Sequence, residues 1–374
     1  MYRSGHNEPD SKSGCRVTGT WVRIPPSPPF FYLGGTMYQV INGSERIVIS
    51  PFLQDEHFHF ELEKDFLKKG DKYKDLIAAN ACVVDHKIYI ATRNKEYPIL
   101  QCDKNGNVLK EMGHGLLDTP HCIFPTSSGT LLCTDSGSFH VIQEIDTSGN
   151  LLRTFGTMKQ PSDSGYDPDA AKKSILVYHL DEVLLQDPKF VIAAKLDSIR
   201  KAAPPFNKPT EMIRVKDGSY FASDGYRNAA IHHFDASGNY EYSFGAPGRA
   251  PGQFRLPHCI MEDARERLWV ADRENDRVQV FDHQGNLLAI FTSLLNPSEI
   301  CCDENYIYIG ESDGGITVCD YDYHIVSQFG HRGSILRCHG FCKDEEGNFY
   351  ISALWINGED TFMKLKRKEQ DVVK

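Results

Sequence analysis

Short apolar runs separated by polar turns dominate the chain, and the stretch from Leu256 to Asn286 shows this pattern most clearly. It reads LPHCIMEDARERLWVADRENDRVQVFDHQGN. The apolar runs CIM and LWVA each end at a polar turn, and VQVFD then alternates with the period of a half-buried strand. A fourth run, Leu287–Thr292, follows the HQGN turn. Four short strands in about forty residues predict one blade of a β-propeller.

The same pattern recurs along the chain in six copies. The residues that open the first strand of each copy are Ala79, His121, Thr210, His258, Ser298 and His339. The steps between them are 42, 89, 48, 40 and 41 residues. The sequence therefore predicts an all-β fold, a six-bladed β-propeller. Because one step is too long by about one blade, we expect residues 156–208 to form an inserted, partly helical segment between blades two and three, with a helix over Phe190–Lys201.

The two ends of the chain differ from the repeats. Residues 1–36 are rich in Ser, Gly and Pro and lack the apolar core of a secretory signal, so we expect a disordered or non-native extension. Residues 37–368 are assigned to the propeller and residues 369–374 to a tail. The segment Tyr38–Ser50 carries two apolar runs around Asn-Gly, which predicts a β-hairpin. One of its strands is expected to close the ring beside Thr361–Leu365.

Composition narrows the classes of partner. The net charge is −10, and the only basic run is the short Lys364–Lys368 stretch, which argues against nucleic acid or an anionic membrane as the main partner. No stretch of eighteen apolar residues occurs, so no transmembrane segment is predicted. The 11 cysteines show no pair of C-x-x-C motifs, which is typical of reduced thiols. Cysteine usage and the missing signal sequence favour a cytoplasmic location.

Three histidines stand at one position of alternate blades. His121, His258 and His339 open the first strands of blades two, four and six, whereas the other blades have a small residue there. Equivalent positions on inner strands line the central channel, so the three imidazoles should surround one axis at one depth. A single histidine is more often structural. Three imidazoles with an open fourth position are the ligand set of catalytic Zn²⁺ or a similar divalent ion.

Further candidate residues follow the second strand of each blade, at one rim. Arg93 and Arg273 could clamp a carboxylate, although an arginine in a turn is more often simply solvated. Tyr226 could serve as a base near a metal, or only pack. The aspartates of TDSG, SDGY and ADRE are expected to cap turn amides, a structural role; they are Asp135, Asp224 and Asp272.

Two sets of motifs in the sequence resemble motifs of known protein families. PHCIMEDARERLWVADRENDRVQVFD resembles the NHL-type propeller repeat. More narrowly, LPH…VADREN, SDGYRN and PPFNKPT resemble the peptidyl-α-hydroxyglycine α-amidating lyase family, over roughly Ala79 to Leu365. The resemblance implies a six-bladed propeller with zinc held by three histidines, which match His121, His258 and His339. It also implies a catalytic tyrosine that matches Tyr226 and two active-site arginines that match Arg93 and Arg273.

The activity that this resemblance implies is cleavage of the C–N bond of a carbinolamide, R–CO–NH–CH(OH)–COO⁻, to an amide and glyoxylate. Three features depart from the family's vertebrate members. Gly340 stands where they have an aspartate that contributes to a calcium site, so Ca²⁺ binding is in doubt. Arg227 stands where they have a disulfide-bonded cysteine. The sequence also contains no copper monooxygenase segment. The family is often secreted or lumenal, so the compartment stays open.

Two other functions remain compatible with the sequence. A non-catalytic NHL propeller would bind a protein or peptide on its rim, but it would not need three histidines on alternate blades. A lactonase-like hydrolase would favour a harder cation held by Glu, Asn and Asp, a different ligand set. We therefore favour a metal-dependent lyase that acts on a small or peptidyl substrate with a carboxylate, and we expect a monomer.

Overall fold

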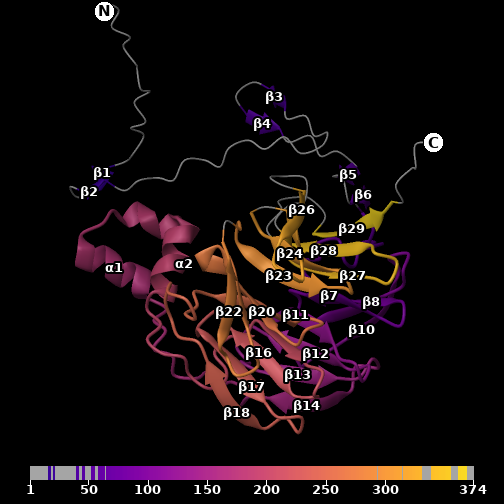
Figure 1. Cartoon of the computed structure of the whole chain (residues 1–374), viewed down its shortest axis with the longest axis horizontal. Helices are drawn as coiled ribbons and strands as arrows, with labels where there is room; N and C mark the ends of the chain where they lie inside the picture. Colours follow the sequence, from indigo (N-terminus) through magenta and orange to yellow (C-terminus); the bar gives the residue numbers. More distant parts are fainter. Residues whose placement is uncertain are drawn as a thin grey trace, which may run out of the picture. The chain divides into compact units, whose positions relative to one another are not determined.

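Six antiparallel sheets form the main body of the chain in the computed structural model (Figure 1). The structure describes residues 58–368 apart from 64, 293, 314, 331–337 and 355–360, together with the backbone of five short strands nearer the N-terminus. Contacts divide the chain into two units, Met1–Gly34 and Gly35–Lys374. The first contains β1 (Arg16–Val17) paired with β2 (Thr20–Trp21). The expectations of disorder in residues 1–36 and of a tail at 369–374 fall largely outside the described residues.

The first three blades are four-stranded meanders. Blade one comprises β7 (Ala78–Val84), β8 (Lys87–Thr92), β9 (Ile99–Cys102) and β10 (Val108–Met112). Blade two comprises β11 (Pro120–Pro125), β12 (Leu131–Asp135), β13 (Ile142–Ile145) and β14 (Leu151–Phe155). Blade three comprises β15 (Glu211–Arg214), β16 (Tyr220–Asp224), β17 (Ala230–Phe234) and β18 (Tyr240–Phe244).

The last three blades repeat this order, and the sixth gains strands from the start of the domain. Blade four comprises β19 (Pro257–Glu262), β20 (Leu268–Asp272), β21 (Arg277–Phe281) and β22 (Leu287–Phe291). Blade five comprises β23 (Pro297–Cys302), β24 (Tyr306–Glu311), β25 (Ile316–Asp320) and β26 (Ile325–Phe329). Blade six comprises β27 (Cys338–Lys343), β28 (Phe349–Ala353), β29 (Phe362–Arg367), β6 (His59–Glu63) and β5 (Phe52–Gln54).

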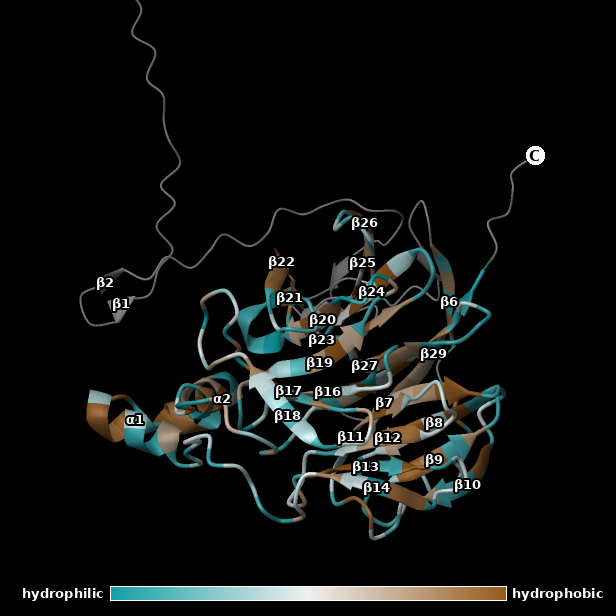
Figure 2. Cartoon of the chain, turned by 60° about the horizontal axis from the view of Figure 1, so that its bottom comes forward, coloured by the Kyte–Doolittle hydropathy of each residue, from teal (hydrophilic) through white to brown (hydrophobic). Residues whose placement is uncertain are grey.

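The inner strands close a ring. Each inner strand contacts the next, in the order β7, β11, β15, β19, β23, β27 and back to β7. The core lies between neighbouring blades, as where Trp269 and Val280 of blade four pack with Ile307 and Ile309 of blade five. Figure 2 shows hydrophobic segments in these strands and hydrophilic ones in the turns. A fully buried aliphatic or phenyl side chain contributes roughly 1.5–3 kcal/mol, so the inter-blade cores can hold a closed ring without a helical layer.

A recurring turn fixes the outer hairpin of most blades. In the Asp-x-x-Gly-Asn sequence, the Asp carboxylate accepts the backbone N–H and the side-chain amide of the Asn. At Asp146 both bonds to Asn150 measure 2.8 Å. Gly149, with φ of 87°, supplies the left-handed residue that this turn requires. Local chemistry therefore sets the spacing of the third and fourth strands.

The closing strand is not the one expected from the sequence. The hairpin predicted in Tyr38–Ser50 forms, with β3 (Gln39–Ile41) paired to β4 (Ser44–Arg46). The strand that pairs with β29 is instead β6, His59–Glu63. Its alternation explains this choice, because Phe60 and Leu62 are buried and the intervening residues are more exposed. Their burial in the cluster of blades five and six stabilises β6 at the ring closure.

The insertion between blades two and three is partly helical, as predicted. It contains α1 (Ala170–Tyr178), the 3₁₀ helix η1 (Glu182–Gln186) and α2 (Pro188–Leu196). The predicted helix over Phe190–Lys201 begins two residues earlier and ends five residues earlier. Asp187 caps the Lys189 N–H with Pro188 at the first position, which fixes the start of α2. The sequence analysis did not foresee α1. None of the helices among the described residues is both long and apolar enough to span a bilayer.

Candidate metal centre

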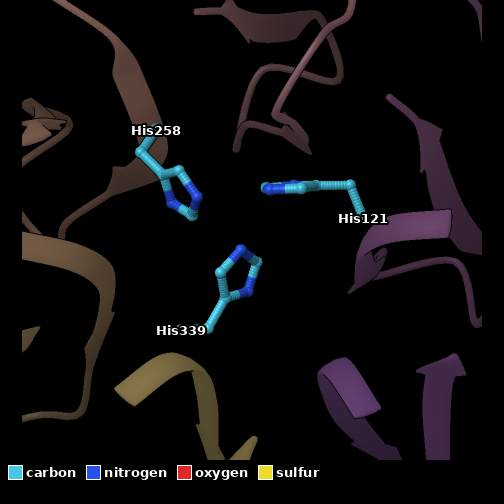
Figure 3. Close-up of side chains that lie close together, drawn as sticks. All are labelled: His121, His258 and His339. Carbon is cyan, nitrogen blue, oxygen red and sulfur yellow. The ribbon is translucent and has the colours of Figure 1, made fainter. Parts of the chain in front are cut away.

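His121, His258 and His339 meet at the propeller axis. Their ring centroids are 4.7, 4.8 and 4.8 Å apart, a nearly equilateral triangle. Figure 3 shows the three rings pointing toward one another from three separate parts of the ribbon. One ligand atom from each ring lies within 4.8 Å of the other two. The structure thus brings together the three histidines that the repeat spacing placed at one depth.

Main-chain carbonyls orient the three imidazoles. Each Nδ1 lies 2.7 Å from a carbonyl oxygen of the next blade: His121 to Thr210, His258 to Ser298 and His339 to Ala79. A carbonyl can only accept, so each Nδ1 carries the proton and each Nε2 keeps its lone pair. This arrangement is common around metal-binding histidines, because the bond fixes both tautomer and ring orientation. The acceptors are the small opening residues of blades one, three and five.

The donor set fits a divalent transition ion such as Zn²⁺. All three rings are buried, and burial, followed by neighbouring charges, lowers the pKa of each imidazole well below its usual value. The rings are therefore neutral at pH 7, as metal ligands must be. His339 Nε2 is buried without a hydrogen-bond partner in the part of the chain that the structure describes. A neutral nitrogen aimed at two others is well placed to coordinate an ion.

Tyr226 reaches the same centre from blade three. Its hydroxyl lies 2.9 Å from His121 Nε2 and 3.3 Å from His258 Nε2. The tyrosine follows β16 after Gly225, where an added Cβ would lie 2.2 Å from the carbonyl oxygen of Pro257. Only glycine fits this close approach, so Gly225 lets the chain turn and carry the phenol to the axis.

Arg93 and Arg273 lie beside this phenol. Arg93 follows β8, interacts with the Tyr226 hydroxyl and donates from Nη1 to Ser136 Oγ at 3.2 Å. Arg273 follows β20, and its guanidinium carbon is 5.8 Å from the centroid of the Tyr226 ring. Glu274 holds Arg273 Nε at 3.2 Å. The structure therefore gathers all six predicted site residues around one centre, with two arginines beside the phenol and the three imidazoles.

The rim contains two further cations that the sequence analysis did not select. Lys208 is half-buried at the end of the insertion, and burial followed by repulsion from Arg227 lowers the pKa of its amine. Arg227 lies over the Tyr166 ring, 4.9 Å from its centroid. Arg227 thus contacts the insertion at the position where the vertebrate family members form a disulfide. A lysine directly after an insertion carries no repeat signal, so only the fold could identify it.

Gly340 is closely packed against the start of blade one. A Cβ built on Gly340 would lie 2.6 Å from Asn80 Nδ2 and 2.9 Å from the Ala79 carbonyl oxygen. An aspartate at this position would therefore force its neighbours to move. The side chain of Asn80 lies in this space instead.

The aspartates at the rim have the structural role that was predicted. Asp135 accepts the N–H groups of Thr119 and Gly137 at 2.9 and 2.8 Å, and Asp272 accepts that of Arg255 at 2.7 Å. Asp224 likewise accepts the Asn207 N–H at 2.8 Å. These carboxylates hold the loops that connect neighbouring blades.

Curated relatives share parts of this sequence, although no family model matches it. A Caenorhabditis elegans protein named a probable peptidyl-alpha-hydroxyglycine alpha-amidating lyase is 30% identical over 192 residues, covering 50% of this chain and 43% of that protein. Human NHL repeat-containing protein 3 is 27% identical over 202 residues, covering 52% and 48%. Peptidylglycine alpha-amidating monooxygenase of Rattus norvegicus is 30% identical over 177 residues, covering 42% and 16%. The matches span less than half the length of each of these relatives.

Solved structures share the fold at low sequence identity. A streptogramin B lyase has a TM-score of 0.52 and 16% identity, covering 83% of this chain and 98% of that one. A gluconolactonase from Xanthomonas campestris has a TM-score of 0.52 and 10% identity, covering 84% and 91%. Together with the six closed blades, these findings show that the chain is a six-bladed β-propeller that resembles NHL repeat-containing protein 3 and the peptidyl-α-hydroxyglycine α-amidating lyases.

Proposed function

We propose that this protein is a metal-dependent carbon–nitrogen lyase. Its substrate would be a peptidyl- or N-acyl-α-hydroxyglycine, or a related small carbinolamide, and its products an amide and glyoxylate. The observation that carries this proposal is the convergence of three carbonyl-oriented histidines with one phenol at the axis. The partial match to curated relatives with amidating names supports the same chemistry.

His121, His258 and His339 would hold the ion through Nε2. A bound Zn²⁺ supplies Lewis acidity, which makes a coordinated hydroxyl more acidic. Tyr226 Oη lies next to two of the ligand atoms, so it is within reach of a proton on a hydroxyl at this centre. Arg93 and Arg273 flank the phenol and provide the charge and the planar fork that bind a carboxylate.

The reaction balances with one proton relocated and no added water. Tyr226, acting as the phenolate, takes the proton from the carbinol hydroxyl, and the C–N bond breaks as the carbon–oxygen bond becomes the aldehyde of glyoxylate. The Tyr226 hydroxyl then gives the same proton to the nitrogen, which leaves as the amide. The two arginines hold the carboxylate, which fixes the carbinol carbon over Tyr226.

The test is the metal content of the purified full-length protein, followed by an assay of glyoxylate release from α-hydroxyhippurate. We expect zinc bound to the three histidines and release of glyoxylate, both lost in His258→Ala. His114→Ala removes an exposed histidine that pairs with Glu96, so it serves as the matched control. Metal without glyoxylate would favour another substrate or a hydrolase. A wild-type protein that binds no metal at this centre after reconstitution would overturn the proposal and leave a binding propeller.

A further inference from the structure

A second ring of residues lies at the axis, one residue further along each inner strand. Its members are Asn80, Cys122, Glu211, Cys259, Glu299 and Gly340. A register shift at the opening residue of five inner strands makes this possible. In blade two, Pro120 and Cys122 pair with neighbouring residues of β12, so His121 is the extra residue. The bulge therefore lets two consecutive side chains face the channel.

Thiols and carboxylates come together in this second ring. One ligand atom each from Cys122, Glu211 and Glu299 lies within 4.8 Å of the other two, although these residues belong to blades two, three and five. Cys122 Sγ is 3.1 Å from Glu211 Oε1, and Cys259 Sγ is 3.0 Å from Glu299 Oε1. All four side chains are buried. Residues from distant blades can approach this closely only at the axis.

A hydrogen bond to its Oε2 atom orients the carboxylate of each glutamate. Glu211 Oε2 accepts the Ile260 N–H at 2.9 Å. Glu299 Oε2 accepts a hydrogen bond from Asn80 Nδ2. Both Oε1 atoms therefore face the thiols, and the outer partners that orient metal ligands are in place.

The ring lacks a positive charge within the described part of the chain. The hydrogen-bond partners of both carboxylates there are thiols, one side-chain amide and backbone N–H groups. Glu211 and Glu299 are only 4% and 5% exposed. Buried carboxylates without a cation are costly, so they must either keep protons or bind an ion.

We propose that Cys122, Glu211 and Glu299 form a second metal site, separate from the three-histidine centre, for a divalent ion of the zinc class. Thiolate excludes Ca²⁺ and Mg²⁺ as preferred occupants, whereas Zn²⁺ accepts both sulfur and carboxylate oxygen. Binding releases the Cys122 proton and any carboxylic proton to solvent. A dication with one thiolate and two carboxylates leaves one negative charge, facing the N–H of Ile260 and the amide of Asn80.

The role of this site would be structural. The three histidines come from blades two, four and six, whereas the second site would join blades two, three and five across the axis. An ion here would tie blades together directly beneath the proposed reaction centre. This inference does not depend on the proposed lyase activity.

Cobalt distinguishes the two sites, because a thiolate bound to Co²⁺ gives a near-ultraviolet charge-transfer band and imidazoles do not. The metal-free full-length protein would be titrated with Co²⁺, and bound metal per chain would be measured by mass spectrometry. We expect two ions and a sulfur band in the wild type. Cys122→Ser should lose the band and one ion, whereas His258→Ala should lose the other ion and keep the band.

Cys133→Ser is the matched control, since this buried thiol of blade two contacts no carboxylate in the described residues and should leave both ions bound. A wild type with one ion and no sulfur band would overturn the second site while leaving the histidine centre intact. An unchanged band in Cys122→Ser would overturn the assignment of its ligand. If Cys122→Ser does not fold, Glu299→Gln provides the same test through the loss of one ion.

Discussion

Blades two, four and six differ from blades one, three and five at the propeller axis. The first set supplies His121, His258 and His339. The second set supplies carbonyl oxygens that accept from Nδ1 of those rings. One set thus presents the ligand atoms and the other aims them.

One residue further, the same division holds in two of the three pairs of blades. Cys122 of blade two lies against Glu211 of blade three, and Cys259 of blade four against Glu299 of blade five. The third pair, Gly340 of blade six and Asn80 of blade one, breaks the pattern. The backbone is six-fold but the histidine layer is three-fold, and a three-fold set of nitrogens suits a tetrahedral ion with one open position. Repetition of the blade therefore builds a cluster of three imidazoles that no single blade contains.

We expect the largest effect, a loss of Zn²⁺ affinity, from removing single histidines, and comparing these variants tests whether the three histidines are equivalent. His121→Ala and His339→Ala should each weaken Zn²⁺ binding by more than about 100-fold, because removing a ligand should exceed the 10–100-fold cost of losing its orienting partner. Ser298→Ala, on the other set of blades, loses a buried hydroxyl but keeps its carbonyl bond to His258. It should retain metal. Metal titration of the three variants gives the answer, and tight binding after loss of either histidine would contradict the three-fold centre.

Tyr226→Phe separates proton transfer from metal binding. Loss of a general base typically reduces kcat by about 10²–10⁴-fold, while the three imidazoles stay in place. The variant should therefore keep its zinc, as metal analysis would show, and lose glyoxylate release. Tyr240→Phe, on the same blade but at the exposed edge, is the control and should be fully active. Normal turnover by Tyr226→Phe would remove the role assigned to the phenol.

Arg273→Lys should produce a smaller loss, confined mainly to substrate binding. A lysine retains the charge but not the planar fork, so KM should rise about 10-fold, equivalent to about 1.4 kcal/mol. Steady-state kinetics with α-hydroxyhippurate would measure this. Arg265→Lys serves as the control, because Arg265 is an exposed arginine that forms an ion pair with Asp322. Equal KM values for the two variants would argue against a carboxylate clamp.

Glu311→Gln tests a rim carboxylate of blade five through the pH dependence of stability. Burial raises the pKa of Glu311 to about 7, so the folded state binds this proton more tightly than the unfolded state. This stabilisation is complete below the usual glutamate pKa and is lost as pH rises through about 7. The loss amounts to roughly 3 kcal/mol. Glutamine can still accept the Leu295 N–H, so the variant should gain relative stability from pH 5 to pH 8 in denaturant titrations. Parallel pH profiles would contradict the assignment.

The repeat pattern predicted the blades and the histidine centre because both follow from spacing. Equal steps between opening residues place equivalent side chains at one depth, whichever residues fill the rest of the blade. The closing strand was predicted wrongly because both candidate segments have strand-like alternation. Only the burial of Phe60 and Leu62 between blades decided in favour of β6.

The amino-acid sequence by itself determined the number of blades, the place of the insertion and the convergence of His121, His258 and His339. Local turn chemistry and a fixed period are sufficient for these features. The tertiary structure alone decided the carbonyl partners of the imidazoles and the meeting of Cys122 with Glu211 and Glu299. Those contacts join residues up to 260 positions apart. They depend on ring closure and on bulges that turn two consecutive side chains to the axis, which strand alternation alone does not predict.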